Sequence, residues 1–170
     1  SNSGTVKTGG LLLSHRFDTR DSYVNPTEGT VVQIEGERMF DPGWANTNAT
    51  RYALTGQYYA GLFYPKTVIA VRARLSAVDG SEVPTQLMMS NGGTGTLRGS
   101  PQDRYLDNIC AVVNVECRFP LVWRLGGVLG LDAGKVWNEW KALDLNRWTS
   151  NPVVGLRLYM DTFVVRADLG

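Results

Sequence analysis

The chain has 170 residues, which is enough for one domain with a sizeable hydrophobic core, and nothing in its composition suggests two domains. Its net charge of +1 and its lack of a basic patch argue against a nucleic-acid partner. No apolar run approaches the roughly 20 residues of a membrane-spanning helix. A membrane β-strand needs only about 9–11 residues of alternating polarity, so the alternation along the chain must decide whether it spans a membrane.

Glycine is abundant and scattered, the prolines lie between segments, and no helical period of about 3.6 residues persists for three turns. These features predict an all-β chain of about eight antiparallel strands in an up-and-down meander. The expected strands cover residues 10–17, 30–40, 51–63, 67–78, 108–119, 122–136, 153–159 and 162–169.

Each expected strand of the second half has one apolar face and one face with ionised groups. In residues 108–119, for example, Val113 and Val115 lie on one face, while Glu116 and Arg118 lie on the other. A soluble sandwich also alternates, but its polar faces look into bulk water and its apolar faces pack on each other. A membrane barrel has the reverse geometry, with apolar residues facing lipid around a polar lumen.

A set of tyrosines favours the barrel over the sandwich. Tyr52, Tyr58 and Tyr64 share a face with Leu54 and Leu62. Aromatic rings distributed in this way along an apolar stripe suit the girdles that barrels place at membrane interfaces.

Loop lengths point the same way, because short connections alternate with long ones along the chain. Short turns are expected at residues 22–29, 64–66, 119–121 and 160–161, and long loops at 41–50, 79–107 and 137–151. Outer-membrane barrels have short periplasmic turns and longer external loops. We therefore predict a single transmembrane β-barrel domain, or barrel segment, over residues 1–170, with a long external loop at 79–107.

No residue pattern indicates catalysis, a metal or a cofactor. Cys110 and Cys117 are on one expected strand at an odd spacing, which puts them on opposite faces, and they match no zinc motif. His15 is the only histidine and lies among apolar residues without a visible partner for a base role. The glycine-rich residues 91–95 lack the Lys-Ser/Thr of a phosphate loop. We expect no enzyme activity, no metal site and no cofactor.

Several motifs, in order along the chain, resemble one known family. Residues 18–21 followed by 26–29 resemble the strand-turn signature of the bacterial surface antigen family, the outer-membrane-protein-85 superfamily that includes BamA, TamA and the two-partner secretion transporters. Residues 91–93, leading to Leu97-Arg98-Gly99, resemble its sixth external loop, whose arginine motif folds back into the barrel lumen. Four further stretches resemble the later strands of the family's barrel, namely residues 116–121, 131–134, 155–157 and 166–168.

The resemblance covers nearly the whole chain and corresponds to the C-terminal half of the family's barrel. Two positions depart from the family pattern, since Ser100 and Leu131 stand where aromatic residues are usual. Both substitutions remove packing area without touching the charges.

An arginine in a lumen with little water needs a carboxylate, and bidentate pairing is the strong geometry for it. Asp132 and Glu116 lie on the lumen faces of the two strands that follow the loop, so we predict an Arg98–Asp132 pair, with Glu116 as the second candidate. We interpret the lumen arginines as a structural charge lattice rather than a conduction filter. The expected lumen network consists of Arg98, Gly99, Glu116, Arg118, Asp132, Gly134, Arg166 and Asp168.

The resemblance implies a protein of the bacterial outer membrane, exported with a signal peptide that is then removed. It implies a role in the insertion or translocation of polypeptides, with membrane lipid and a polypeptide client as partners and no nucleic acid. The alternative is a structural or pore-forming outer-membrane barrel that kept the scaffold and lacks assembly activity. An enzyme and a soluble β-sandwich are the remaining classes.

The expected strand count leaves the closure of the barrel open. With the short turns in the periplasm, both chain ends lie outside, whereas relatives usually continue with one more strand. A closed eight-stranded barrel has room inside only for side chains and not for the loop at 79–107. An open sheet would leave unsatisfied backbone groups in lipid, at several kcal/mol each. Three arrangements follow: a segment of a larger barrel, a homodimeric ring of two half-barrels, or a small closed barrel with its loop outside.

Overall fold

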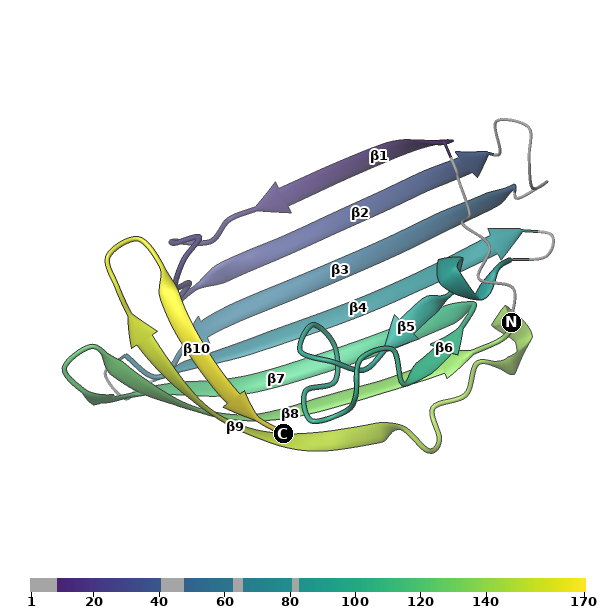
Figure 1. Cartoon of the computed structure of the whole chain (residues 1–170). Helices are drawn as coiled ribbons and strands as arrows, with labels where there is room; N and C mark the ends of the chain where they lie inside the picture. The colour runs from purple at the N-terminus through teal and green to yellow at the C-terminus, as the bar shows by residue number, and fades with distance from the viewer. Residues whose placement is uncertain (1–8, 41–47, 63–65, 81–82) are drawn as a thin grey trace.

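The structure, a computed structural model, describes residues 9–40, 48–62, 66–80 and 83–170. Its main sheet consists of β1 (Gly9–Asp18), β2 (Gly29–Phe40), β3 (Ala49–Gly61), β4 (Val68–Gly80), β7 (Ile109–Val122), β8 (Leu125–Trp137), β9 (Thr149–Tyr159) and β10 (Val164–Leu169). Neighbouring strands of this sheet are antiparallel and follow chain order, which confirms the all-β meander (Figure 1). No helix in the described part of the chain is long and apolar enough to cross a membrane.

The eight expected strands correspond to the eight strands of the sheet, with two errors. The strand β9 begins at Thr149, inside the loop expected at 137–151, and the β7–β8 turn is misplaced. The sequence analysis places this turn at residues 119–121, because the prolines of the chain lie between segments. In the structure β7 continues through Pro120, its register shifts before Val122, and the turn begins at Trp123, which has a positive φ of 52°. Proline is tolerated at such a bulge near a strand end. The expected turn residue Tyr64 lies outside the described residues.

The two faces of the sheet differ as a membrane barrel requires. Leu129 and Leu131 of β8 are 53% and 50% exposed, whereas the neighbouring Asp132 is fully buried. Tyr58 of β3 is exposed on the same outer face, which carries the apolar side chains. A soluble sandwich would bury the leucines and leave the carboxylate in water, so the burial pattern is that of a barrel wall.

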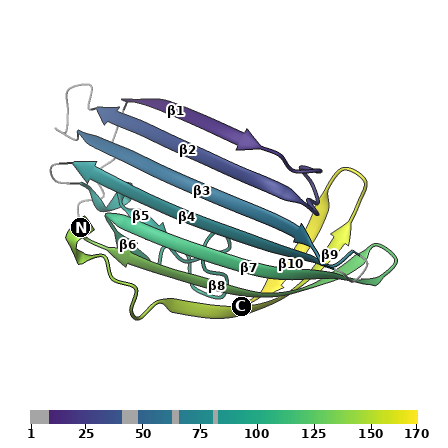
Figure 2. The ribbon, with the colours of Figure 1, turned by 180° about the vertical axis from the view of Figure 1, so that it is seen from behind.

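The sheet is an open, curved wall. Within the described residues β1 pairs only with β2, and β10 pairs only with β9. The connection between β4 and β7 lies against one face of the wall, in front of it in Figure 1 and behind it in Figure 2. We call this the inner face. The small closed barrel with its loop outside is therefore wrong, because the sheet does not close and the loop lies on the inner face. An open sheet is compatible with the other two arrangements, a segment of a larger barrel and a homodimeric ring of two half-barrels.

An apolar cluster attaches the β4–β7 connection to the inner face. The connection contains a 3-10 helix, η1 (Thr85–Leu87), and two short strands that the sequence did not predict, β5 (Met89–Asn91) and β6 (Tyr105–Asp107), which pair with each other. Met89 of β5 packs into a buried cluster with Val78 of β4 and Cys110 of β7. Cys110 and Cys117 are both free. The cluster holds the base of the connection, and the polar contacts of its tip form the candidate site.

Candidate functional site

The tip of the connection, residues 92–100, is a compact turn that carries Arg98. Its backbone is closed by a hydrogen bond of 3.0 Å from the Gly93 amide to the Ser100 carbonyl. Leu97 is fully buried, so the turn has its own apolar anchor beside the arginine. Positive φ values, which glycine adopts without strain, occur at Gly92, Gly93 and Gly99. The sequence therefore builds a turn that presents Arg98 from a fixed backbone.

Arg98 and Asp132 of β8, which the sequence analysis paired, are in contact through three hydrogen bonds. The Arg98 side chain donates from Nε to Oδ2 and from Nη2 to Oδ1, both at 2.7 Å, and its backbone amide donates to Oδ2 at 3.0 Å. The side-chain bonds form the bidentate arrangement in which guanidinium and carboxylate match best. Because Asp132 is fully buried and Arg98 is 9% exposed, this pair is shielded from water.

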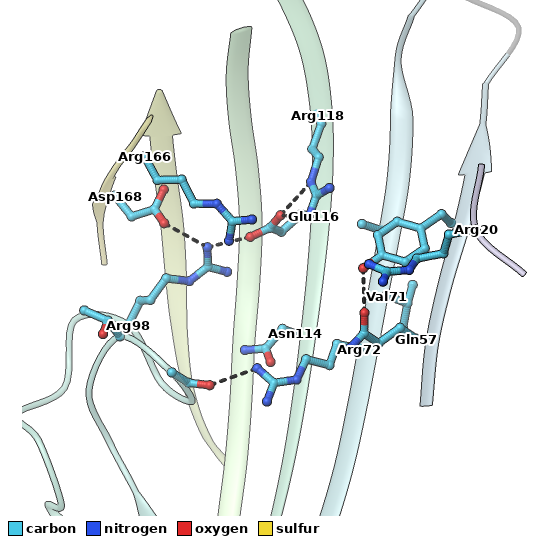
Figure 3. A pocket seen from close by; sticks show the side chains of 14 residues that line it. Arg20, Gln57, Val71, Arg72, Arg98, Asn114, Glu116, Arg118, Arg166 and Asp168 are labelled. Carbon is cyan, nitrogen blue, oxygen red and sulfur yellow. Dashed lines mark hydrogen bonds and ion pairs between the residues drawn. The ribbon is translucent and has the colours of Figure 1, made fainter. Parts of the chain in front are cut away.

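Two further carboxylates share the same guanidinium. Nη1 of Arg98 lies 2.6 Å from Glu116 Oε1 of β7 and 3.3 Å from Asp168 Oδ2 of β10. Figure 3 shows Arg98 between these two carboxylates. One loop arginine therefore connects β7, β8 and β10, which are three separate strands of the wall.

A second layer of arginines balances these carboxylates. Arg118 of β7 donates from Nε to Glu116 Oε2 at 2.8 Å. Arg157 of β9 is ion-paired with Asp168 and lies 3.6 Å from Glu116 Oε1. Buried ion pairs are stable only when the remaining hydrogen-bonding positions are also filled. The arrangement is therefore a connected network, and each carboxylate in it has at least one arginine partner.

Two asparagines hold the backbone of the loop, and they were missing from the expected network. Asn151 of β9 donates to the Arg98 carbonyl at 2.8 Å and to the Ser100 hydroxyl at 2.9 Å. Asn114 of β7 donates from Nδ2 to the Thr96 carbonyl and to Asp132 Oδ1, each at 2.8 Å. The strand register puts both asparagines directly opposite Asp132, which is the signal that could have identified them.

The electrostatics keep Arg98 charged. Its hydrogen bonds with Asp132 are the main reason that the pKa of the Arg98 guanidinium is raised above its ordinary value, and the bond to Glu116 adds to the effect. Burial alone would act in the opposite direction, because it disfavours the charged form. The loop is therefore attached by a permanent charge rather than by a group that titrates at physiological pH.

Gly134 and Gly99 have steric reasons for their positions. A Cβ atom at Gly134 of β8 would overlap the side-chain amide of Asn91, which is fully buried against the strand. At Gly99 a Cβ would overlap the backbone of Gly170, and the φ of 83° disfavours other residues. Both glycines let the loop approach the wall closely.

The structure brings together most, but not all, of the expected network. Arg98, Glu116, Asp132, Asp168 and Arg118 are connected by hydrogen bonds or ion pairs. Arg166 lines the same cavity as Arg98, Glu116 and Asp168 and makes no ion pair among the described residues.

The two departures from the family pattern have different local consequences. Ser100 forms a hydrogen bond where an aromatic residue is usual, and Leu131 faces outwards.

Within the described residues, no group of His, Cys, Asp and Glu side chains is arranged to hold a metal.

An outer face of exposed apolar side chains, a charged inner face and a loop ion-paired to that face define part of an outer-membrane β-barrel. The Omp85 superfamily domain matches residues 1–153. The chain belongs to the Omp85 superfamily, which confirms the family resemblance.

One matching solved structure is the crystal structure of BamA from Haemophilus ducreyi lacking POTRA domains 1–3. It is 19% identical to this chain, with a TM-score of 0.78, and the similarity covers 94% of this chain and 38% of the BamA chain. This chain thus spans about two fifths of that relative, and the likeness concerns the fold. No curated protein matches by sequence.

Proposed function

We propose that this chain forms one wall of an outer-membrane barrel that inserts or translocates polypeptides. The observation that carries the proposal is the attachment of the β4–β7 connection to the inner face by Arg98 and its three carboxylates. A lumen wide enough for a polypeptide would also pass ions and small solutes unless something occupied it. A loop fixed inside the wall by ion pairs supplies such an obstruction, while the superfamily and the BamA-like fold support the assembly or translocation class.

The partners in this proposal follow from the two faces. Lipid chains contact the exposed apolar outer face, and a polypeptide client passes along the charged inner face, where water and fixed charges satisfy its backbone groups. Edge strands offer unpaired backbone donors and acceptors, which are suited to adding a strand. Closure of the wall by further strands or by a second copy completes the lumen. Membership of the superfamily favours this transport or assembly role over catalysis.

A reconstitution assay tests the proposal. Purified protein in liposomes should increase the rate at which an unfolded outer-membrane barrel client becomes protease-resistant, compared with empty liposomes. Arg98→Ala should change that rate. Arg104→Ala, in the same loop, is the matched control, because Arg104 is exposed and the polar contacts of its side chain within the described residues go to the neighbouring Tyr105. Equal client insertion with and without the protein would contradict the proposal.

The alternative is a pore-forming or structural barrel without assembly activity, and the water-accessible cavity on the charged inner face favours it. Conductance in planar bilayers distinguishes the two roles. Stable, client-independent channels without any client insertion would support the pore. Client insertion by the reconstituted chain alone would exclude a purely structural barrel.

The number of chain copies in the solubilised particle distinguishes a homodimeric ring from a segment of a larger barrel. We propose that the wall closes either as a homodimeric ring or within a larger barrel. The mass of the detergent-solubilised particle, corrected for bound detergent, should correspond to two copies for the ring. A single copy would exclude the homodimer.

A further inference from the structure

The inner face contains a cavity of about 280 Å³ whose walls are rich in arginine. It lies between the tip of the β4–β7 connection, the strands β3, β4, β7 and β10, and the turn after β1. Figure 3 shows the arginine side chains reaching into this space from several directions. Five arginines and two carboxylates line it: Arg20, Arg72, Arg98, Arg118, Arg166, Glu116 and Asp168.

Three of these arginines are neutralised by carboxylates. Arg98 contacts three acidic residues, as described above, and Arg118 pairs with Glu116 at 2.8 Å. Arg20 pairs with Asp18 at 2.8 Å. Their charges are therefore already balanced within the wall.

Arg166 and Arg72 have no such partner. Among the described residues neither guanidinium lies within 4.0 Å of a carboxylate, and the hydrogen bond from Arg72 goes to the neutral Gly95 carbonyl at 2.9 Å. Arg166 stands directly opposite Arg157 in the β9–β10 register, so its cross-strand neighbour is another cation. Like charges in this position repel each other.

The charge balance of the cavity is consequently positive. The side chains that line the cavity and their direct ion-pair partners include six arginines and four carboxylates. The partners that do not themselves line the cavity are Arg157, Asp18 and Asp132. The excess of two positive charges corresponds to Arg72 and Arg166. Arg72 is half-buried and Arg166 is exposed. The partial desolvation of Arg72 and the repulsion between Arg166 and Arg157 are both unfavourable, and a bound anion would relieve them.

We infer that this cavity binds a small oxyanion, of the phosphate or carboxylate type, between Arg166 and Arg72. The planar guanidinium group donates two parallel hydrogen bonds to such anions, which makes arginine the side chain best suited to them. The volume is sufficient for one such anion with several waters, since a water occupies about 30 Å³. The inference is independent of any polypeptide-inserting activity.

Isothermal titration of the intact protein in detergent with sodium phosphate tests the inference. Titration with sodium chloride at matched ionic strength gives the background. Phosphate should bind saturably, and succinate should compete with it because both present anionic oxygens. Absence of saturable phosphate binding would overturn the inference, as would binding of a short-chain phosphatidylglycerol but not of free phosphate.

Arg166→Gln is the decisive variant, because Arg166 makes no ion pair in the described residues. The dissociation constant for phosphate should increase at least about tenfold, which corresponds to roughly 1.4 kcal/mol. The melting temperature in phosphate-free buffer should not fall, because the substitution removes a repulsion rather than a stabilising bond. An unchanged dissociation constant would refute the site.

Arg124→Gln is the matched control. Arg124 lies at the β7–β8 turn, outside the cavity, and pairs with the exposed Asp161. Its phosphate affinity should equal that of the unaltered chain. Equal weakening in Arg124→Gln and Arg166→Gln would show that net charge, and not the cavity, determines binding. Loss of client insertion with intact phosphate binding would count against the proposed function alone.

Discussion

Replacing Arg98 by alanine should release the tip of the β4–β7 connection from the wall. The substitution removes the bidentate pair with Asp132 and the bond of 2.6 Å to Glu116. Asp132 is fully buried and would retain as partners only the Asn114 amide and, if the turn stayed in place, the residue-98 amide. Breaking a buried ion pair by removing one member costs about 3–5 kcal/mol, because the other charge is left uncompensated.

The magnitude can be measured as proteolysis of the loop. Arg104 follows the tip and is exposed, so trypsin cleavage after it reports how often the loop opens. If opening is fast relative to cleavage, a loss of about 3 kcal/mol increases the cleavage rate roughly a hundredfold. The thermal midpoint in detergent should fall as well. Arg98→Lys should give an intermediate effect, because an ammonium group cannot form the same planar fork.

Arg124→Ala is the control for this experiment, because it removes an arginine from an exposed ion pair at the opposite end of β7. Such pairs contribute about 0–1 kcal/mol, so its cleavage rate and midpoint should stay close to those of the unaltered chain. If Arg98→Ala left both quantities unchanged, the idea that ion pairs hold the loop on the inner face would be refuted.

Three further substitutions test other parts of the site. Gly134→Ala should lower the free energy of unfolding by about 1–3 kcal/mol through overpacking, whereas Gly36→Ala, where a Cβ meets nothing within 4 Å, should not; equal urea midpoints would contradict the close contact. Asn151→Ala removes two hydrogen bonds to the loop and should destabilise by about 1–2 kcal/mol, and an unchanged urea midpoint would show that these bonds contribute nothing. In the β1–β2 turn, a hydrogen bond from Thr27 lowers the pKa of Asp21, so its stabilising effect is present above the unfolded pKa of about 3.9 and is lost as the pH falls through the folded value. The protection of the turn's amides, measured as the observed exchange rate relative to the intrinsic rate at each pH, should fall on acidification in the unaltered chain and much less in Asp21→Asn, and identical acid dependence would refute the assignment.

The faces of the sheet could be predicted because a strand has a period of two. Each apolar position therefore implies a polar neighbour on the other face, as Leu131 and Asp132 illustrate. The family resemblance placed the loop of Arg98 in the lumen, and charge then selected Asp132, since an arginine with little water needs a carboxylate and few were placed to reach it. The resemblance to the Omp85 superfamily rested on the order of several short motifs along the chain.

The remaining features depend on register and local backbone geometry. Pro120 indicated a turn, but a bulge lets the strand continue, and Trp123 adopts the positive φ at the actual turn. Asn114 and Asn151 carry no charge, so nothing in the hydrophobic or charge pattern distinguishes them until the register places them beside Asp132. The position of Arg166 opposite Arg157 is equally a matter of register.

The most direct test of the account is a double-mutant cycle between Arg98 and Asp132, measured by reversible urea unfolding in detergent. Arg98→Ala, Asp132→Ala and the double variant give the coupling energy of the two side chains. The account predicts a coupling of at least about 2 kcal/mol, because each single variant leaves a buried partner unpaired while the double variant removes both charges. Additivity within about 0.5 kcal/mol would contradict the claim that this ion pair fixes the loop to the wall.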